Sequence, residues 1–296
     1  MVHPLLLVTL LVALTPPTSA DNDYDLIVYG SSPAGIAAAV AAGQLGLSVA
    51  LYEPLPMIGG MGAAGNLALN DGGMNAERTG LAKKFSLING KHYYNDTTMT
   101  SQPREVPHPE SFVANATFYE MLDGANVKEI HLDCRLLAVN TTADTVRSVT
   151  VSCLPDPVTA VVFIDASYDG ELMVQSGIID YTSGRESVDK YNESLAGARS
   201  PGWSGVAGPH GVSPFQSDNV TLLKYVNNLT TLAAPGSADD RLMAFQHRMC
   251  IAGDENRVAW PKPTNYNPDD FQLLQKTIGK RNIRRHCPIR NIIESF

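Results

Sequence analysis

Cysteine, tryptophan and cationic side chains are all scarce in this chain. Its 296 residues include 4 cysteines, 2 tryptophans and 22 lysines and arginines, against 30 aspartates and glutamates. Four cysteines are too few for a fold of this length to depend on disulfides. A formal net charge of −8 disfavours a nucleic-acid-binding protein, which needs a clustered basic face. No Cys-x-x-Cys or His-x-x-x-His spacing occurs, so we predict no metal site.

The chain also has no long apolar run. Residues 5–14 are apolar but too few to span a bilayer, and Thr18-Ser19-Ala20 resembles a signal-peptide cleavage site. We therefore predict a signal peptide over residues 1–20, a secreted mature chain and no membrane contact after cleavage; a retained anchor is the alternative. Six Asn-x-Ser/Thr sequons favour N-glycosylation on a eukaryotic secretory route. They begin at Asn95, Asn115, Asn140, Asn192, Asn219 and Asn228.

A βαβ pattern stands near the start of the mature chain. A short apolar run at residues 26–29 is followed by a glycine-bearing turn, and residues 36–45 are rich in alanine and free of proline, which favours a helix. A second apolar run at residues 47–52 ends in Glu53. This order is typical of a Rossmann-like α/β domain that binds a dinucleotide. The alternative is a doubly wound sheet that binds no dinucleotide.

The predicted phosphate turn has the pattern Gly-x-Ser-x-x-Gly, with Ser32 in place of the usual middle glycine. Its first glycine permits the tight turn and its last allows the helix to pack close to the sheet. The helix then directs its N-terminal N–H groups and the positive end of its dipole toward a pyrophosphate. The predicted pyrophosphate residues are Gly30, Ser31, Ser32, Pro33, Ala34 and Gly35.

Two signals after the turn concern the rest of the cofactor. Glu53 lies about 20 residues beyond the turn, where a carboxylate accepts hydrogen bonds from ribose hydroxyls and disfavours a 2′-phosphate. Gly59 and Gly60, followed by Met61, would let the chain pass close to a pyrophosphate and a flavin ring. The sequence therefore favours a flavin dinucleotide over a nicotinamide cofactor, and an NAD-linked dehydrogenase is the weaker alternative.

The remaining pattern predicts a mixture of strands and helices. Residues 66–111 read as loops and short helices, residues 155–157 as a turn, and Asp165-Ala166-Ser167 follows a strand end. Cys134 and Cys153 fall on neighbouring predicted strands and either pair or are separate buried side chains. The predicted helices cover residues 112–122, 171–176 and 269–278; the predicted strands cover residues 127–132, 135–139, 146–153, 160–164, 178–182 and 242–251.

Several stretches together resemble the FAD-dependent oxidoreductases of the glutathione-reductase-like superfamily, and most closely a secreted, little-characterised branch. These stretches are Tyr24-Asp25-Leu26-Ile27-Val28-Tyr29-Gly30, Pro33-Ala34-Gly35-Ile36-Ala37-Ala38-Ala39, Glu53-Pro54, Ile58-Gly59-Gly60-Met61 and Phe163-Ile164-Asp165-Ala166-Ser167-Tyr168-Asp169-Gly170. The resemblance implies a Rossmann-like FAD-binding domain over residues 21–180 and a β-rich substrate region over residues 181–278. It also implies FAD as cofactor and a small-molecule substrate.

Carried over to this sequence, the resemblance assigns roles to individual residues. The turn from Gly30 to Gly35 would contact the pyrophosphate, Glu53 would hold the adenosine ribose, and Gly60 and Met61 would approach the flavin. The strand-end residues Asp165, Ala166 and Ser167 would lie along the cofactor. For Asp165 the alternative is a purely structural cap at the strand end.

The resemblance ends near Ile278, and a basic tail over residues 279–296 follows. The Gly-rich segment that closes the FAD site of this group late in the chain has no counterpart, so we expect a C-terminally truncated member. The alternative function is a non-catalytic remnant that at most binds an adenine dinucleotide. No catalytic residue is predicted, because packed or solvated roles are more typical of the candidates. These are Tyr168, Arg185, His210, His247 and Arg248.

Overall fold

The structure is a computed structural model. It describes residues 22–63, 65, 77–94, 104–191, 196–198, 212–226, 234–242 and 261–280. The chain divides after Tyr181 into two compact units, 1–181 and 182–296. The predicted signal peptide and three of the candidate polar residues, His210, His247 and Arg248, lie outside the described residues.

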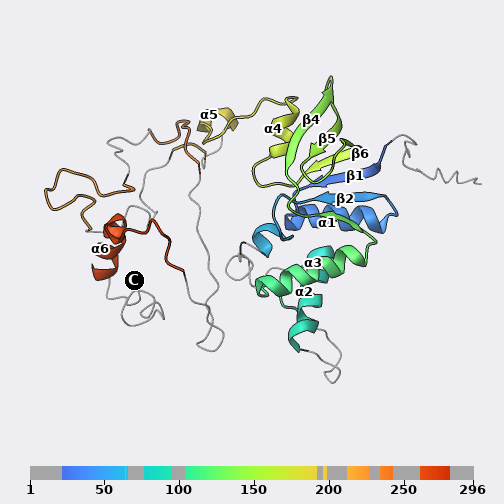
Figure 1. The fold of residues 1–296 in the computed structure, drawn as a ribbon, viewed down its shortest axis with the longest axis horizontal. Helices are drawn as coiled ribbons and strands as arrows, with labels where there is room; N and C mark the ends of the chain where they lie inside the picture. The colour runs from blue at the N-terminus through green and yellow to red at the C-terminus, as the bar shows by residue number, and fades with distance from the viewer. Residues whose placement is uncertain are drawn as a thin grey trace, which may run out of the picture. The chain divides into compact units, whose positions relative to one another are not determined.

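A six-stranded sheet forms the centre of the first unit, with the strand order β3-β2-β1-β6-β5-β4 (Figure 1). The first four strands in this order are parallel, and β5 and β4 form an antiparallel hairpin beside β6. This is the mixed α/β architecture with a Rossmann-like parallel core that the sequence predicted. The strands are β1 (Tyr24–Tyr29), β2 (Val49–Tyr52), β3 (Glu129–His131), β4 (Leu136–Thr142), β5 (Thr145–Val151) and β6 (Val158–Asp165).

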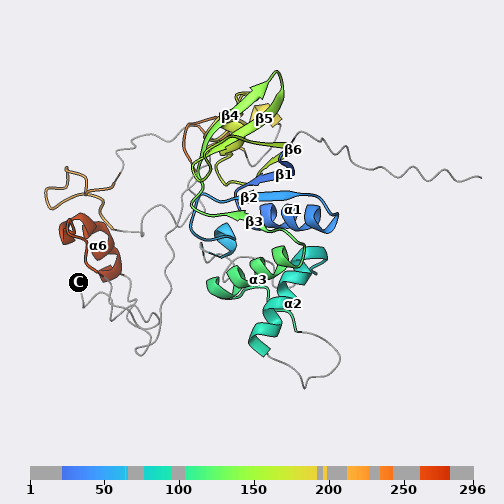
Figure 2. The ribbon, with the colours of Figure 1, turned by 45° about the vertical axis from the view of Figure 1, so that its right-hand side comes forward.

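Helices cover one face of this sheet. The helix α1 (Pro33–Gln44) contacts β1 and β2, and α3 (Ser111–Asp123) packs on α1 (Figure 2). The helix α2 (Gly80–Tyr94) packs in turn on α3. Leu26 and Val28 of β1 are buried in this layer. The βαβ unit predicted from the apolar runs is therefore confirmed.

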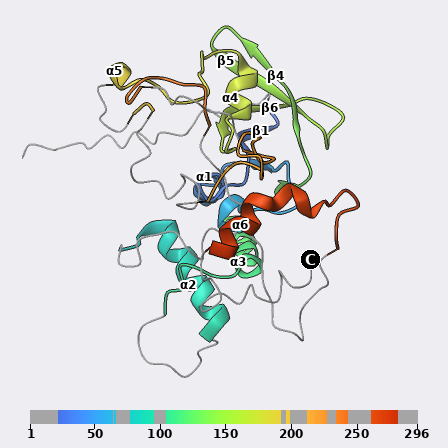
Figure 3. The same cartoon turned by 90° about the vertical axis from the view of Figure 1, so that its left-hand side faces the viewer.

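The β4–β5 hairpin and the short helix α4 (Glu171–Ser176) bury the other face of β1. Ile27 and Tyr29 lie in this second core, and α4 contacts β4 and β6 (Figure 3). The Tyr29 hydroxyl donates to Glu171 over 2.6 Å and accepts from the backbone N–H of Leu136 over 3.0 Å. Because both faces of β1 are covered, its buried part, residues 26–29, is continuously apolar rather than alternating.

Two sequence-based predictions about elements are wrong. Residues 80–94 form one long helix, α2, where loops and short helices were expected; its Phe85 stacks on Phe118 of α3 with ring centroids 4.7 Å apart. Residues 178–182 form no strand. Ile179 and Tyr181 in that segment are 58% and 57% exposed, so no layer covers the apolar side chains that suggested a strand.

Cys134 and Cys153 form a disulfide, which decides between the two alternatives left open for them. Cys134 lies between β3 and β4, and Cys153 follows β5. Their Cα atoms are 5.0 Å apart. The covalent link therefore joins the parallel part of the sheet to the hairpin.

The described part of the second unit contains α5 (Val188–Tyr191), a 3₁₀-helix η4 (Pro268–Phe271) and α6 (Gln272–Lys280). It also has isolated β-bridges between Arg185 and Asp239 and between Phe215 and Leu222. The helix predicted at 269–278 is confirmed as η4 and α6 together. Except for Leu242, the strand predicted at 242–251 lies outside the described residues. Among the described helices none has the length and apolar character needed to cross a membrane.

Candidate functional site

The predicted site residues gather at the carboxyl ends of three neighbouring parallel strands. Tyr29, Tyr52 and Asp165 lie in register at the last positions of β1, β2 and β6. The phosphate turn follows the first of these strands and Glu53 follows the second. In open α/β sheets, ligands bind in the crevice outside the carboxyl ends of the strands. The sheet therefore brings together, in one place, residues more than 130 positions apart in the sequence.

Close backbone contacts explain both glycines of the turn. Gly30 has φ +89°, and a Cβ there would lie 2.6 Å from the backbone nitrogen of Ser167. A Cβ on Gly35 would lie 2.4 Å from the carbonyl oxygen of Gly30 and 2.7 Å from Cβ of Ala166. The turn therefore packs so closely on the start of α1 and on the β6–α4 connection that no larger side chain fits between them.

The first turn of α1 opens the site toward solvent. Ser32 is the N-cap, and its hydroxyl oxygen accepts from the backbone N–H of Gly35 over 3.3 Å. Pro33 occupies the first helical position, where its missing N–H costs little. Pro33 and Ala34 are exposed while Ser31 and Ser32 are buried. This exposed helix start can receive an anionic group at its positive end.

Glu53 is buried and its carboxylate faces the turn. One carboxylate oxygen accepts from both the backbone N–H (2.8 Å) and the hydroxyl of Ser31, and the other accepts from the N–H of Leu55 over 2.9 Å. The backbone of Glu53 is held as well, because its N–H donates to the carbonyl of His131 and its carbonyl accepts from the N–H of Cys134. These hydrogen bonds from both sides hold the Glu53 carboxylate in a fixed position beside the turn.

The Gly59–Met61 segment returns to the same turn. Gly59, at φ +98°, donates its N–H to the carbonyl of Ser31 over 2.9 Å. Gly60 and Gly62 bound the 3₁₀-helix η1, and Met61 within it is 45% exposed. The segment therefore forms a second edge of the site, beside the start of α1.

Tyr168 joins this edge to the end of β6, and sequence reasoning missed its role. Its hydroxyl oxygen accepts from the N–H of Met61 over 2.7 Å, and a Cβ on Gly60 would lie 2.5 Å from that oxygen. Burial raises the pKa of the Tyr168 phenol, so the hydroxyl is protonated at neutral pH. Its position directly after Asp165-Ala166-Ser167 could have indicated that Tyr168 lies near the site. Its contact with Met61 could not be predicted, because it depends on the fold.

Asp165 acts as a local cap in this structure. One carboxylate oxygen accepts from both the N–H and the hydroxyl of Ser167, and the other accepts from the N–H of Met173 over 2.9 Å. The Ser167 hydroxyl oxygen also accepts from the N–H of Glu171 at the start of α4. Asp165 therefore positions the strand-end loop that packs on Gly30, and its direct contact with the cofactor stays a prediction.

The other described candidate, Arg185, lies in the second unit. It forms a bidentate pair with Asp239, with 2.8 Å between Nε and Oδ1 and a second, shorter contact through Nη2. Hydrogen bonding to Asp239 raises the pKa of the guanidinium, and the pair joins the two strands of an isolated β-bridge. This arrangement is structural.

Comparison with known proteins places the chain among flavin enzymes. Residues 25–291 match the family model described as FAD dependent oxidoreductase, a match that continues past Ile278, where the recognisable motifs end. A curated relative named NADH:fumarate oxidoreductase, from Klebsiella pneumoniae, is 34% identical over 100 residues. That alignment covers 33% of this chain and 10% of the relative, so this chain spans only a small part of the relative's length.

Solved structures show only a distant likeness. A geranylgeranyl bacteriochlorophyll reductase-like protein from Thermoplasma acidophilum matches with 15% identity and a TM-score of 0.36, covering 55% of this chain and 44% of the other. L-proline dehydrogenase from P. horikoshii matches with 12% identity and a TM-score of 0.38, covering 55% and 58%. The FAD-bound form of OTEMO matches with 18% identity and a TM-score of 0.32, covering 49% and 25%.

Proposed function

Because the chain belongs to the FAD dependent oxidoreductase family, we propose that it is a secreted oxidoreductase that holds FAD at the carboxyl ends of β1, β2 and β6. FAD is the cofactor of the family, and the substrate class is a small molecule. The observation that carries the proposal is the Ser31–Glu53 contact, which sets a ribose-type carboxylate directly beside a glycine turn at a helix start.

The residues at this site fit the cofactor. The exposed start of α1, with its backbone N–H groups and dipole, would hold the pyrophosphate through the Gly30–Gly35 turn. Among the described residues, the second carboxylate oxygen of Glu53 accepts one hydrogen bond, from the Leu55 N–H, which leaves acceptor capacity for ribose hydroxyls. Gly59 and Gly60 have positive φ, and a Cβ on either would meet Phe118 or Tyr168, so glycine lets this segment lie close beside the start of α1.

Bound flavin supplies the electron-transfer chemistry of such an enzyme, and the protein supplies binding, orientation and polarity. In this chain Asp165 and Ser167 fix the loop beneath the turn, while Tyr168 ties that loop to Met61. These residues have positioning roles in the proposal. None of them is assigned a proton-transfer step.

The absorbance spectrum of purified protein, before and after addition of FAD, tests the cofactor proposal. We expect two flavin bands that remain with the protein through gel filtration and bleach with dithionite. The Asp25→Asn variant, altered at the opposite end of β1, is the matched control and should retain the bands. Folded protein that takes up ADP but never FAD would instead support the nucleotide-binding remnant. Protein that binds neither ligand would overturn both readings.

Secretion is the second part of the proposal. A disulfide favours an oxidising compartment, which agrees with a cleavable signal peptide over residues 1–20. Of the sequons, Asn140 and Asn219 are exposed and suit a glycan. Asn115 does not, because it lies within α3 and its side-chain amide donates to the carbonyl of Ile58 over 3.1 Å.

Expression in a eukaryotic secretory host tests this part. We expect the protein in the medium, beginning at Asp21, with a mobility that increases after removal of N-glycans. Peptide mass spectrometry should find glycans at Asn140 and Asn219, and none at Asn115. Retention of an unprocessed, unglycosylated chain inside the cell would argue against secretion.

A further inference from the structure

The connection between β3 and β4, residues 132–135, lies directly against the backbone that carries Glu53. The carbonyl of His131, the last residue of β3, accepts from the N–H of Glu53 over 2.8 Å. The N–H of Cys134 donates to the carbonyl of Glu53 over 2.9 Å, and the N–H of Asp133 donates to the carbonyl of Leu55 over 3.1 Å. The backbone N–H of Glu53 is therefore bound to the end of β3, and its carbonyl is bound to the connection that follows.

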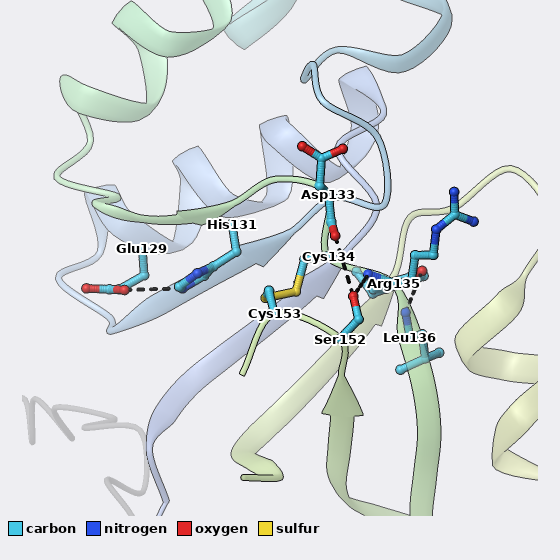
Figure 4. Close-up of a disulfide and its surroundings, with 9 residues drawn as sticks. Glu129, His131, Asp133, Cys134, Arg135, Leu136, Ser152 and Cys153 are labelled. Atoms are coloured by element: carbon cyan, nitrogen blue, oxygen red, sulfur yellow. Dashed lines mark hydrogen bonds and ion pairs between the residues drawn. A yellow bond between two sulfur atoms is a disulfide. The ribbon is translucent and has the colours of Figure 1, made fainter. Parts of the chain in front are cut away.

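On its other side, the same connection is bound to the end of β5 by hydrogen bonds and a disulfide (Figure 4). The Ser152 hydroxyl accepts from the N–H of Arg135 over 2.8 Å and donates to the carbonyl of Asp133 over 3.4 Å. The N–H of Ser152 donates to the carbonyl of Arg135 over 2.8 Å. The disulfide between Cys134 and Cys153 adds a covalent link at this point.

The connection is also held by packing, because Leu132 lies against the core that contains α1 and α3, and Cys134 is buried in the second core. The connection contains no regular element, and Asp133 adopts a left-handed backbone with φ +52°, which is uncommon for a residue other than glycine. Such a conformation persists only where the surroundings determine it. Here the surroundings include the Glu53 backbone on one side and the disulfide with Ser152 on the other.

We propose that the Cys134–Cys153 disulfide is a positioning element for the ribose carboxylate, so that its oxidation state sets the affinity for the adenosine part of the cofactor. The inference rests on the proposed role of Glu53. Binding is strongest when the acceptor is already in place before the ligand arrives. Without the disulfide the connection moves more freely, the Glu53 backbone loses a fixed partner, and its carboxylate spends less time in the binding geometry.

Reduction of the disulfide is chemically accessible from one side. Cys134 is fully buried, whereas Cys153 is exposed. One thiolate of a dithiol such as dithiothreitol attacks Sγ of Cys153, the sulfur–sulfur bond breaks, and Cys134 leaves as a thiolate that takes up a proton. The second thiol then attacks the mixed disulfide, which releases Cys153 as a thiol and leaves a cyclic disulfide. Two electrons and two protons pass from the dithiol to the protein.

The experiment measures ADP affinity by calorimetry for oxidised and dithiothreitol-reduced protein. A background with Cys250→Ser and Cys287→Ser restricts the redox change to this pair, and near-ultraviolet circular dichroism monitors the fold. We expect reduction to weaken ADP binding on the order of tenfold, with the fold retained. Equal affinities of the two folded forms would overturn the inference while leaving the proposed function intact. Absence of ADP and FAD binding by oxidised protein would overturn the proposed function itself.

A double-mutant cycle separates positioning from general stability. If the disulfide acts through Glu53, reduction should cost much less affinity in a Glu53→Gln protein than in the parent; equal, additive losses would contradict the mechanism. Asp25→Asn is the control background, in which the full loss should persist. Should the reduced protein unfold, Ser152→Ala decides the question, because it keeps the disulfide and removes the hydroxyl that holds the same connection. Ser152→Ala should lower the ADP affinity of the parent protein more than it lowers that of the Glu53→Gln protein.

Discussion

Two serine–carboxylate pairs join β1 to β2 at opposite ends of the strands. At the carboxyl end, Glu53 accepts from the N–H and hydroxyl of Ser31. At the amino end, Asp25 accepts from the N–H and hydroxyl of Ser48, each over 2.8 Å. The bonding pattern is the same, but Glu53 is 5% exposed and Asp25 borders solvent.

The difference lies in what surrounds each pair. The Glu53 pair is surrounded by the start of α1, the Gly59–Met61 segment and the end of β6. The Asp25 pair only connects β1 to the loop before β2. Hydrogen bonds from Ser48 lower the pKa of Asp25. The same local chemistry is therefore structural at one end of the sheet and part of a candidate binding site at the other, because helix N-termini and strand carboxyl ends coincide there.

Charge reversal at Glu53 should have the largest effect. Glu53→Arg replaces a buried acceptor of three hydrogen bonds with a buried cation, and Ser31 and Leu55 lose their partner. We expect a loss of about 3–5 kcal/mol in the free energy of unfolding and no retained FAD. Denaturant unfolding and flavin absorbance measure these. Unchanged FAD affinity in a folded variant would rule out the ribose role.

A side chain at Gly35 should break the packing at the end of the sheet that carries the Glu53 pair. Gly35→Val would place Cβ 2.4 Å from the carbonyl of Gly30, so the turn and α1 must move apart. We expect a loss of about 3 kcal/mol in stability together with weaker FAD binding. The control is Gly124→Val, since Gly124 has a helical φ of −64° and the nearest atom to a Cβ there is the carbonyl oxygen of Glu120, 3.2 Å away. Equal stability losses in the two variants would mean that packing at the turn is not the cause.

Removal of the charge at Asp165 tests the strand-end cap. Both carboxylate oxygens of Asp165 accept hydrogen bonds, one from Ser167 and the other from Met173. The Asp165→Asn side chain has only one oxygen, so one of these acceptors is lost. We expect a loss of about 1–2 kcal/mol in stability and weaker FAD binding, because the loop that packs on Gly30 loosens. Thermal unfolding with and without FAD measures both. Loss of FAD binding with unchanged stability would instead favour direct contact with the cofactor.

Loss of the Tyr168 hydroxyl should have a smaller effect. Tyr168→Phe keeps the ring on Gly60 and removes the acceptor of the Met61 N–H. We expect FAD dissociation to accelerate by roughly fivefold, which corresponds to about 1 kcal/mol, with little change in stability. Stopped-flow release of flavin fluorescence measures the rate. A dissociation rate equal to that of the parent would show that the link does not hold the cofactor.

The Asp25 pair should contribute least to binding. Asp25→Asn should leave FAD affinity within about twofold of the parent, because the site is at the other end of the sheet. Since the folded-state pKa of Asp25 is lowered, its contribution to stability is present above its unfolded pKa of about 3.9 and is lost as pH falls below that value. The variant should therefore show a weaker fall in stability on acidification than the parent. If the variant and the parent lose stability equally on acidification, Asp25 does not contribute to the acid sensitivity of the fold.

Local patterns were sufficient for the first βαβ unit. Glycines at fixed spacing, a proline at the first helical position and two apolar runs reflect nearest-neighbour constraints, so β1, α1 and β2 could be predicted. The helix α2 could not, because it mixes apolar, polar and glycine residues and its partner α3, on which Phe85 stacks through Phe118, is known only from the fold. The strand expected at 178–182 failed for the converse reason: its apolar side chains have no layer to cover them.

The sequence by itself determined that a glycine turn, a strand-end carboxylate and a glycine pair exist in order, because few residue types meet the backbone requirements of the glycine positions. Only the tertiary structure decided how they are used. It set Ser31 against Glu53, brought Tyr168 to Met61 and joined Cys134 to Cys153. Each of these contacts links separate segments of the chain, and their partners are chosen by strand order and register, which no local pattern encodes.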